Sequence, residues 1–222
     1  MIPYYPSVNG ALASQYNRRA LVCHSPINWR NPFWLEDDKR RDPVHMVFLD
    51  DNGVIFTAKY KDVGGYSDLS PMMRFPEVIL NLAEAYARKG DVTNGLKYLN
   101  MVRDRSLADP ATQAYTAASF ANNLELLEAI LYERRIELAM EGRRWPDIHR
   151  LQACPHFPVD GVPAKYANGA PAGADFDLSL GVFDGPYGVN QIPYSDHRFV
   201  WPIPQDELNA NPTLATQQNP GW

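Results

Sequence analysis

The sequence predicts a mainly α-helical protein with long irregular loops and a small β-hairpin. Three observations support this prediction: two helical patterns joined at a glycine, a long helical pattern rich in glutamate and arginine, and two β-branched runs around an Asn-Gly pair. The 222 residues are enough to bury a substantial core, and we expect residues 1–222 to form a single domain.

Composition and charge exclude several classes of function. Hydrophobic residues make up 45% of the chain and charged residues 21%, as in ordinary globular proteins. A net charge of −5 does not favour nucleic-acid binding overall, although a local basic patch stays possible. No apolar run approaches the roughly 20 residues of a membrane span. The first residues lack a basic start followed by an apolar stretch, so we expect no signal peptide.

The chain holds two cysteines, Cys23 and Cys154. Cys23 follows Ala20, Leu21 and Val22, an order similar to a lipidation site, but two arginines precede it instead of an apolar segment. We therefore expect no lipidation there. Free thiols are the favoured state of both cysteines, with a disulfide left open.

The N-terminal part is predicted to be irregular over residues 1–43 and to lead into a β-hairpin over residues 44–60. The runs 44–49 and 54–60 are rich in β-branched and aromatic residues, and they flank a turn that contains Asn52-Gly53.

Two helices joined by a short turn are predicted next. An apolar stripe over residues 76–89 ends at Gly90, which suits a left-handed helix cap, and Asp91 can cap the second helix. Small residues, Ala83 and Gly95, stand where the helices would touch. Four residues have the register of a tetratricopeptide hairpin: Tyr86, Gly90, Gly95 and Leu99.

A long helix is predicted from Asn122 or Asn123 to Glu141, ended by Gly142, with a short helix over 145–151. Helical hairpins thus occupy residues 76–151. No periodic segment longer than a few residues follows, so residues 152–222 are predicted to be loop-rich.

The long helix carries a ladder of glutamates, Glu133, Glu137 and Glu141, spaced four residues apart. Like charges at this spacing repel, and the helix has an apolar stripe on either side of them. We therefore expect the ladder to be partly buried at a seam and neutralised by arginine. Arg134 is the expected partner of Glu137, three residues on. The expected cations for the other two glutamates follow Gly142: Arg143, Arg144 and Arg150.

Catalytic and metal-binding readings of this ladder fit less well. Glycoside hydrolases place their carboxylates on facing elements around a cleft, not on one helix. A metal could use Glu137, Glu141, Asp147 and His149, but the Glu-x-x-His pairs of di-iron proteins are absent and the arginines would oppose a cation. The chain also lacks the motifs of nucleophilic hydrolases, zinc proteases and nucleotide-binding proteins. We expect no catalytic residue, no metal and no cofactor.

Three motifs in order resemble those of the SusD/RagB family. The first motif in the chain is residues 73–91, MRFPEVILNLAEAYARKGD, preceded by Lys59-Tyr60. The second is the glutamate-arginine run of the long helix. The run comprises Ile130, Glu133, Arg134, Glu137, Leu138, Glu141, Gly142, Arg144, Asp147, Ile148 and Arg150. The third motif is the ending: Pro202, Ile203, Pro204, Glu207, Leu208, Asn211, Pro212, Leu214, Gln218, Asn219, Pro220, Gly221 and Trp222. The resemblance runs from about residue 40 to the end.

The resemblance implies tetratricopeptide-like helical hairpins that scaffold a loop-rich face. It implies a non-enzymatic lipoprotein, surface-exposed at the cell outer membrane, that binds an oligosaccharide or other nutrient. Its partner would be a SusC-like TonB-dependent transporter barrel. Family members are longer at the N-terminus, where they carry a signal peptide, a lipidated cysteine and further hairpins. This chain resembles their C-terminal portion.

Two hypotheses of function follow, a glycan-binding protein and a helical-repeat scaffold that binds only another protein. For the first, aromatic rings of the irregular N-terminal segment are the expected sugar contacts: Trp29, Trp34, Tyr4 and Tyr5. The alternative is that these rings anchor loops to the core. Solvent exposure separates the two hypotheses at five aromatic residues: Trp29, Trp34, Tyr166, Tyr187 and Tyr194.

Overall fold

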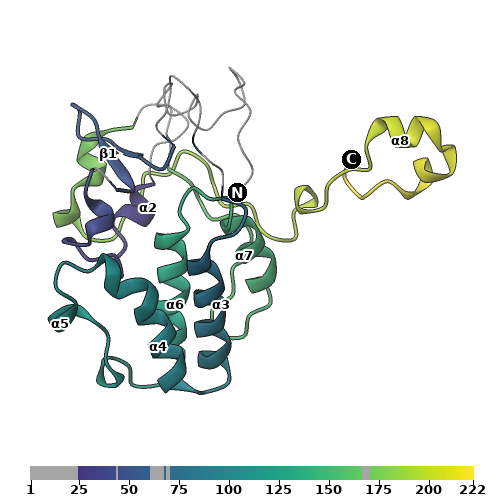
Figure 1. Ribbon diagram of the computed structural model, residues 1–222. Helices are drawn as coiled ribbons and strands as arrows, with labels where there is room; N and C mark the ends of the chain where they lie inside the picture. Colours follow the sequence, from purple (N-terminus) through teal and green to yellow (C-terminus); the bar gives the residue numbers. More distant parts are fainter. Residues whose placement is uncertain (1–24, 44, 61–67, 69–70, 167–170) are drawn as a thin grey trace. The chain divides into compact units, whose positions relative to one another are not determined.

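A computed structural model describes residues 25–43, 45–60, 68, 71–166 and 171–222 (Figure 1). The chain divides into two compact units, Met1–Trp145 with Lys165–Val189, and Pro146–Ala164 with Asn190–Trp222. Each unit is described by itself below. The single domain over residues 1–222 stays a prediction. No helix among the described residues is long and apolar enough to cross a membrane.

The described part of the N-terminal segment is partly helical, where the sequence predicted irregular structure. Helix α2 spans Pro26–Trp29, and a 3-10 turn, η1, spans Lys39–Arg41. Each begins at a capping side chain: Ser25 accepts from the backbone N–H of Ile27, and Asp38 from that of Arg40. These local caps explain why the short turns form without an apolar period.

The predicted hairpin is present in the first unit. Strands β1 (Val47–Leu49) and β2 (Ile55–Thr57) are antiparallel, with Phe48 opposite Phe56. Asp50 holds the turn, because its Oδ1 accepts from the backbone N–H of Val54 at 2.8 Å. Gly53 has a φ of +80°, a left-handed conformation that glycine adopts without strain.

Helices α3 (Phe75–Arg88) and α4 (Val92–Arg103) form the predicted antiparallel pair and pack side by side with α6 (Figure 1). Asp91 caps α4 by accepting from the backbone N–H of Asn94 at 3.0 Å. Gly95 lies where the three helices meet: a Cβ there would lie 3.0 Å from Leu126 Cδ2 and 3.3 Å from Ala87 N. The small residues thus let the helices approach closely.

Helix α6 spans Asn123–Glu137, and Asn122 caps it as predicted. A loop with one short helix, α5 (Pro110–Gln113), and two 3-10 turns, η2 (Asp104–Ser106) and η3 (Ala117–Ser119), connects α4 to α6.

Helix α6 ends four residues before the predicted end at Glu141. Side chains from elsewhere take its last carbonyls: Lys59 Nζ donates to Glu137 O at 2.8 Å and Ala139 O at 2.9 Å, and Arg74 Nη2 donates to Glu137 O at 2.9 Å. Cations at a helix C-terminus are favoured by its dipole. The chain then turns through Met140, at a φ of +64°, so Glu141 lies beyond the helix.

The loop-rich remainder belongs to both units. Helix α7 spans Arg144–Leu151, and α8 spans Gln205–Ala210. The rest is irregular apart from short 3-10 turns, which include η4 (Gly173–Phe176), η5 (Leu178–Leu180), η6 (His197–Phe199) and η7 (Pro212–Gln217). In the second unit an antiparallel bridge pairs Val162 with Ile192. The mainly helical fold with one hairpin is confirmed.

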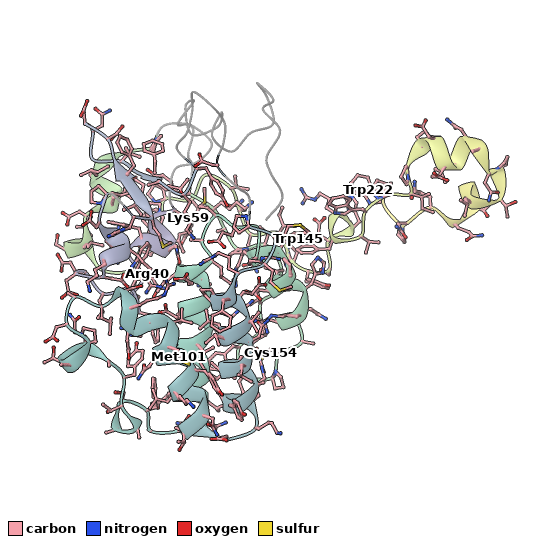
Figure 2. The ribbon with its side chains drawn as sticks, viewed as in Figure 1. Arg40, Lys59, Met101, Trp145, Cys154 and Trp222 are labelled. Carbon is pink, nitrogen blue, oxygen red and sulfur yellow. The ribbon has the colours of Figure 1, made fainter. Side chains whose placement is uncertain are left out.

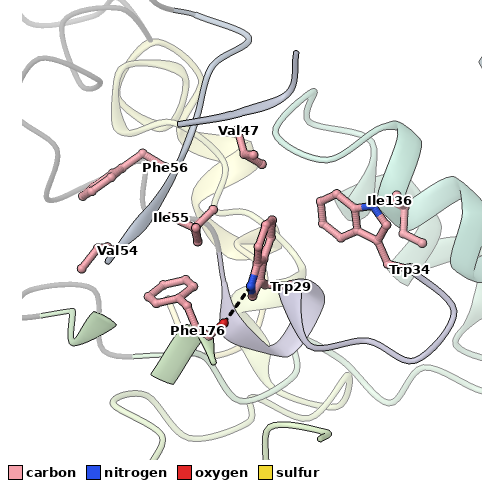
Figure 3. Packing of buried hydrophobic residues seen from close by; sticks show 8 residues of the cluster. All are labelled: Trp29, Trp34, Val47, Val54, Ile55, Phe56, Ile136 and Phe176. Carbon is pink, nitrogen blue, oxygen red and sulfur yellow. Dashed lines mark hydrogen bonds between the residues drawn. The ribbon is translucent and has the colours of Figure 1, made fainter. Parts of the chain in front are cut away.

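A hydrophobic core in the first unit joins the hairpin to the helices (Figure 3). Its members are Trp29, Trp34, Val47, Val54, Ile55, Phe56, Ile136 and Phe176. The two tryptophan rings meet edge to face at 5.4 Å between centroids, and Trp29 Nε1 donates to Phe176 O at 2.9 Å. Helix α2 is thus fixed to η4 although the two are far apart in sequence.

Candidate functional site

The glutamate ladder lies on the last turns of α6 and just beyond its end. Its side chains are buried where α6 meets η1 and the end of the hairpin. The side chains of Glu133, Glu137 and Glu141 are at most 3% exposed. The cations that form ion pairs with them, within the described residues, include Arg40, Lys59, Arg74, Arg103 and Arg105. The geometry therefore supports a buried, neutralised ladder, with partners that the sequence did not indicate.

Arg40 lies at the centre of this cluster. Its Nη1 is 2.5 Å from Glu133 Oε1 and 3.1 Å from Glu137 Oε2. Its Nη2 is 2.7 Å from Asp38 Oδ2, and Arg103 Nη1 completes the surroundings of Glu133 at 3.5 Å. The planar guanidinium thus bridges three carboxylates, which an ammonium group could not do with the same directional fit.

Glu137 and Glu141 share the remaining cations. Arg74 Nη1 lies 2.8 Å from Glu137 Oε1, and its Nε lies 2.7 Å from Glu141 Oε2. Lys59 Nζ is 2.5 Å from Glu141 Oε1, and Arg105 Nη2 is 2.5 Å from Glu137 Oε1. Lys59 and Arg74 therefore neutralise the ladder and cap α6 at the same time.

Burial and charge act on these groups in opposite directions. Burial alone would raise the pKa of Glu137, but Arg105, Arg40 and Arg74 more than offset it, so this pKa is below its ordinary value. Burial lowers the pKa of Lys59, and Glu141 only partly restores it. For Arg40, burial would lower the pKa, but the carboxylates around it, with Glu133 the strongest, raise it above its ordinary value.

Two of the arginines expected beside the ladder, Arg143 and Arg150, form ion pairs with other carboxylates. Arg134 Nη1 donates to Asn81 Oδ1 at 2.5 Å, Arg143 pairs with Glu77 at 3.2 Å, and Arg150 pairs with Asp147 at 2.7 Å. The cations beside the ladder come from η1 (Arg40), the end of the hairpin (Lys59), the start of α3 (Arg74), and the end of α4 with η2 (Arg103 and Arg105). Arg74 and Arg40 are 63 and 97 residues from Glu137. Spacing along one helix carries no signal for partners so distant.

An open cleft of about 660 Å³ lies over the ladder. Its lining is Lys39, Arg40, His45, Met46, Lys59, Tyr60, Pro71, Arg74, Arg105, Ser106, Glu137 and Glu141. Five cations and two carboxylates give the lining a net charge of +3 with His45 neutral, although the whole chain carries −5. Figure 2 labels Arg40 and Lys59, two residues of this lining.

Tyr60 contributes a hydroxyl to the cleft. The residue is 4% exposed, and within the described part of the chain its hydroxyl has no hydrogen-bond partner. Burial, helped by the charge of Glu141, raises the pKa of Tyr60 to about 12. The hydroxyl is therefore protonated at neutral pH and can donate a hydrogen bond.

The tryptophans expected to contact sugar are corrected to core residues. Trp29 is 7% exposed and Trp34 2% exposed, and Arg41 covers them, with its guanidinium carbon 4.3 Å and 4.5 Å from the two ring centroids. A buried ring cannot stack on a ligand in solution. Tyr4 and Tyr5 lie outside the described residues, so their proposed role stays a proposal.

The three loop tyrosines, Tyr166, Tyr187 and Tyr194, differ in how far their rings are exposed to solvent. Tyr187 is exposed, packed edge to face against Phe183 at 5.8 Å. Tyr166 is half-buried and donates from its hydroxyl to Asp175 Oδ2 at 2.7 Å. Tyr194, in the second unit, is half-buried beside His149, with 2.8 Å between its hydroxyl and Nδ1. Only Tyr187 among these three presents an open ring.

Cys154 is a buried free thiol, and Cys23 lies outside the described residues. Within the ranges that the structure describes, no group of three or more His, Cys, Asp or Glu side chains is arranged to hold a metal ion. The carboxylates of the ladder are surrounded by cations instead.

The geometry defines a mainly helical protein with a tetratricopeptide-like hairpin and a buried charge cluster that joins its helices to a loop-rich face. The chain belongs to the SusD family, whose family model matches residues 51–222.

Relatives and solved structures agree with this assignment. SusD-like protein P2 of Formosa agariphila is 30% identical over 154 residues, which are 68% of this chain and 25% of that protein. SusD-like protein P38 of the same organism is 28% identical over 141 residues, 59% of this chain and 24% of that protein. The chain thus spans about a quarter of the length of these relatives.

A protein from Bacteroides vulgatus, named as sugar-binding, has a similar structure with a TM-score of 0.53 at 26% identity; the match covers 83% of this chain and 37% of that one. A SusD superfamily protein from Bacteroides fragilis has a TM-score of 0.55 at 23% identity, with 90% of this chain and 40% of that one covered. The second match shows a shared fold.

Proposed function

We propose that this chain is part of a non-catalytic glycan-binding protein, the nutrient-binding component of an outer-membrane TonB-dependent uptake complex. Membership of the SusD family and the likeness to a protein named as sugar-binding support glycan binding. The cleft over the ladder is the observation that carries the proposal for this chain. Its volume of about 660 Å³ lies within the range of small-molecule sites, and buried polar groups converge on it.

A rigid loop gives further support. Arg30 donates to four carbonyl oxygens of one loop, those of Asp175 (3.3 Å), Leu180 (3.0 Å), Gly181 (2.6 Å) and Val182 (3.2 Å). The loop leads to the exposed ring of Tyr187, a surface on which a sugar can stack. A fixed loop loses little conformational entropy when a ligand binds.

The non-catalytic part of the proposal rests on the state of the carboxylates. General acid-base catalysis needs a carboxyl group that can exchange a proton with a substrate. Both Glu137 and Glu141 are instead bonded to cations on both oxygens. Neither is available to a glycosidic bond while these pairs are intact.

Calorimetric titration of the chain with a panel of neutral and acidic oligosaccharides tests the proposal, with chromatography of each sugar after prolonged incubation. We expect saturable binding of at least one sugar and its recovery unchanged. Absence of heat with every sugar would contradict glycan binding, and shortened products would contradict the non-catalytic role.

Co-purification with the TonB-dependent barrel encoded nearest to this gene tests the transporter partner.

A helical-repeat scaffold without a small-molecule ligand is the second candidate. The outer face of α3 favours it, because Phe75, Val78 and Leu82 are exposed along one side of the helix. Apolar side chains gathered on one face commonly mark a protein contact. The scaffold hypothesis expects no saccharide binding in the titration above.

A further inference from the structure

We propose that the cleft over the glutamate ladder binds the acidic group of a saccharide, a uronic acid carboxylate or a sulfate ester. This inference rests on the proposed glycan-binding function and narrows its ligand class. It follows from which hydrogen-bonding groups of the cleft are already used and which are free.

The carboxylate acceptors of the cleft are used by the protein. Glu137 accepts from Arg74 and Arg105 at Oε1 and from Arg40 at Oε2. Glu141 accepts from Lys59 and Arg74 at Oε1 and again from Arg74 at Oε2. Sugar hydroxyls both donate and accept hydrogen bonds, and as donors they would compete with these cations for the two carboxylates.

The free groups of the cleft are mainly donors. Tyr60 presents a protonated hydroxyl without a partner among the described residues. In that part of the chain the ammonium of Lys39 and the ring of His45 also have no partner, nor has Nη1 of Arg105, whose Nε and Nη2 bond to Val102 O and Glu137. A ligand that satisfies these groups must supply acceptors, and an anionic oxygen is the strongest acceptor available.

The charge of the lining favours the same ligand. When the buried groups that pair with the lining, Asp38, Glu133 and Arg103, are counted with it, six cations stand against four carboxylates, an excess of +2 on a chain whose net charge is −5. The cleft is therefore a local cationic site on an acidic protein. A concave site focuses the field of its charges and attracts ligands of the opposite sign.

The inner cations are also fixed in place. Arg40 and Arg74 are held by several hydrogen bonds each, and Lys59 by three. Their positive charge therefore faces the cleft without the loss of rotamer freedom that flexible surface lysines would suffer on binding. The exposed ammonium of Lys39 and the hydroxyl of Tyr60 can add direct contacts beside these fixed cations.

The test compares two matched ligand pairs by calorimetric titration of the full chain. One pair is trigalacturonic acid and its methyl ester, which differ by the charge on the sugar. The other is a κ-carrageenan oligosaccharide and its desulfated form. We expect the acidic member of at least one pair to bind about tenfold or more tightly. The preference should shrink at an ionic strength of about 1 M, where the Debye length is about 3 Å.

Variants assign the preference to the cleft. Tyr60→Phe removes one hydroxyl and keeps the ring, and Lys39→Gln removes an exposed charge that has no ion-pair partner among the described residues. Each should weaken binding of the acidic sugar several-fold and so reduce its advantage over the neutral member of the pair. Lys97→Gln, a change of the same charge on α4 outside the cleft lining, is the control and should bind like the unmodified chain.

The outcomes separate this inference from the proposed function. If neutral and acidic members of both pairs bind equally, the inference is wrong and the glycan-binding function stands. An acidic preference that both cleft variants retain in full would also overturn it, because the site would lie elsewhere. If no saccharide of any kind binds, the proposed function fails and the inference fails with it.

Discussion

Arg40 and Glu137 are 97 residues apart in the chain, and their side chains meet at 3.1 Å between Nη1 and Oε2. Both side chains are at most 5% exposed. The pair therefore ties η1 to the end of α6 through the interior of the first unit.

Replacing Arg40 by methionine should destabilise the fold severely. The change leaves Glu133 and Glu137 buried without their central cation, and breaking a buried pair from one side costs about 3–5 kcal/mol. Chemical denaturation measures the loss of unfolding free energy. Arg198→Met is the control, since Arg198 is 54% exposed and pairs with Asp196 at the surface, where an ion pair is worth about 0.2–1 kcal/mol. Equal losses in the two variants would show that burial of the Arg40 cluster adds nothing.

Acid should weaken the fold partly through Glu137. The pKa of Glu137 is lower in the folded chain than in the unfolded one, so its contribution to stability is present above about pH 4.5 and is lost as pH falls below that value. Urea denaturation over a series of pH values measures this. In Glu137→Gln the unfolding free energy should be lower at neutral pH and should fall less steeply on acidification. The same slope in both proteins would contradict a titrating role for Glu137.

Trp34→Ala should act on stability. The ring is 2% exposed in the core, and removing a buried large aromatic side chain costs about 3–5 kcal/mol. Thermal unfolding followed by circular dichroism measures the change. Trp201, which is 74% exposed, supplies the control, and Trp201→Ala should change stability by about 0.5 kcal/mol or less. Full stability of Trp34→Ala would mean that the ring is exposed in solution.

Gly95→Val should loosen the three-helix contact. A Cβ at Gly95 already lies at the limit of normal contact with Leu126 and Ala87, so the larger valine must displace α4 from α3 or α6. Overpacking of this kind costs about 1–3 kcal/mol. Thr93→Val, on an exposed position of the same helix, controls for the lower helix propensity of valine. Melting temperatures that match in the two variants would place Gly95 outside the contact.

Local signals in the sequence predicted the helices and most of their caps. Gly90 and Asp91 punctuate α3 and α4, and Asn122 begins α6, because caps depend on side chains within a few residues of the backbone they satisfy. The hairpin follows from its turn in the same way. The end of α6 was predicted too late because its last carbonyls bond to Lys59 and Arg74, which no pattern within α6 could indicate.

The family also followed from sequence alone, because its motifs are ordered residues with fixed spacing. The sequence determined that Glu133, Glu137 and Glu141 need cations, since like charges between two apolar stripes cannot be buried unpaired. Only the tertiary structure decided which cations these are, and it turned Trp29 and Trp34 from expected ligand contacts into core. Ion pairs and burial depend on segments that are distant in the chain and close in space, whereas helix periods, caps and turns depend on neighbours in the chain.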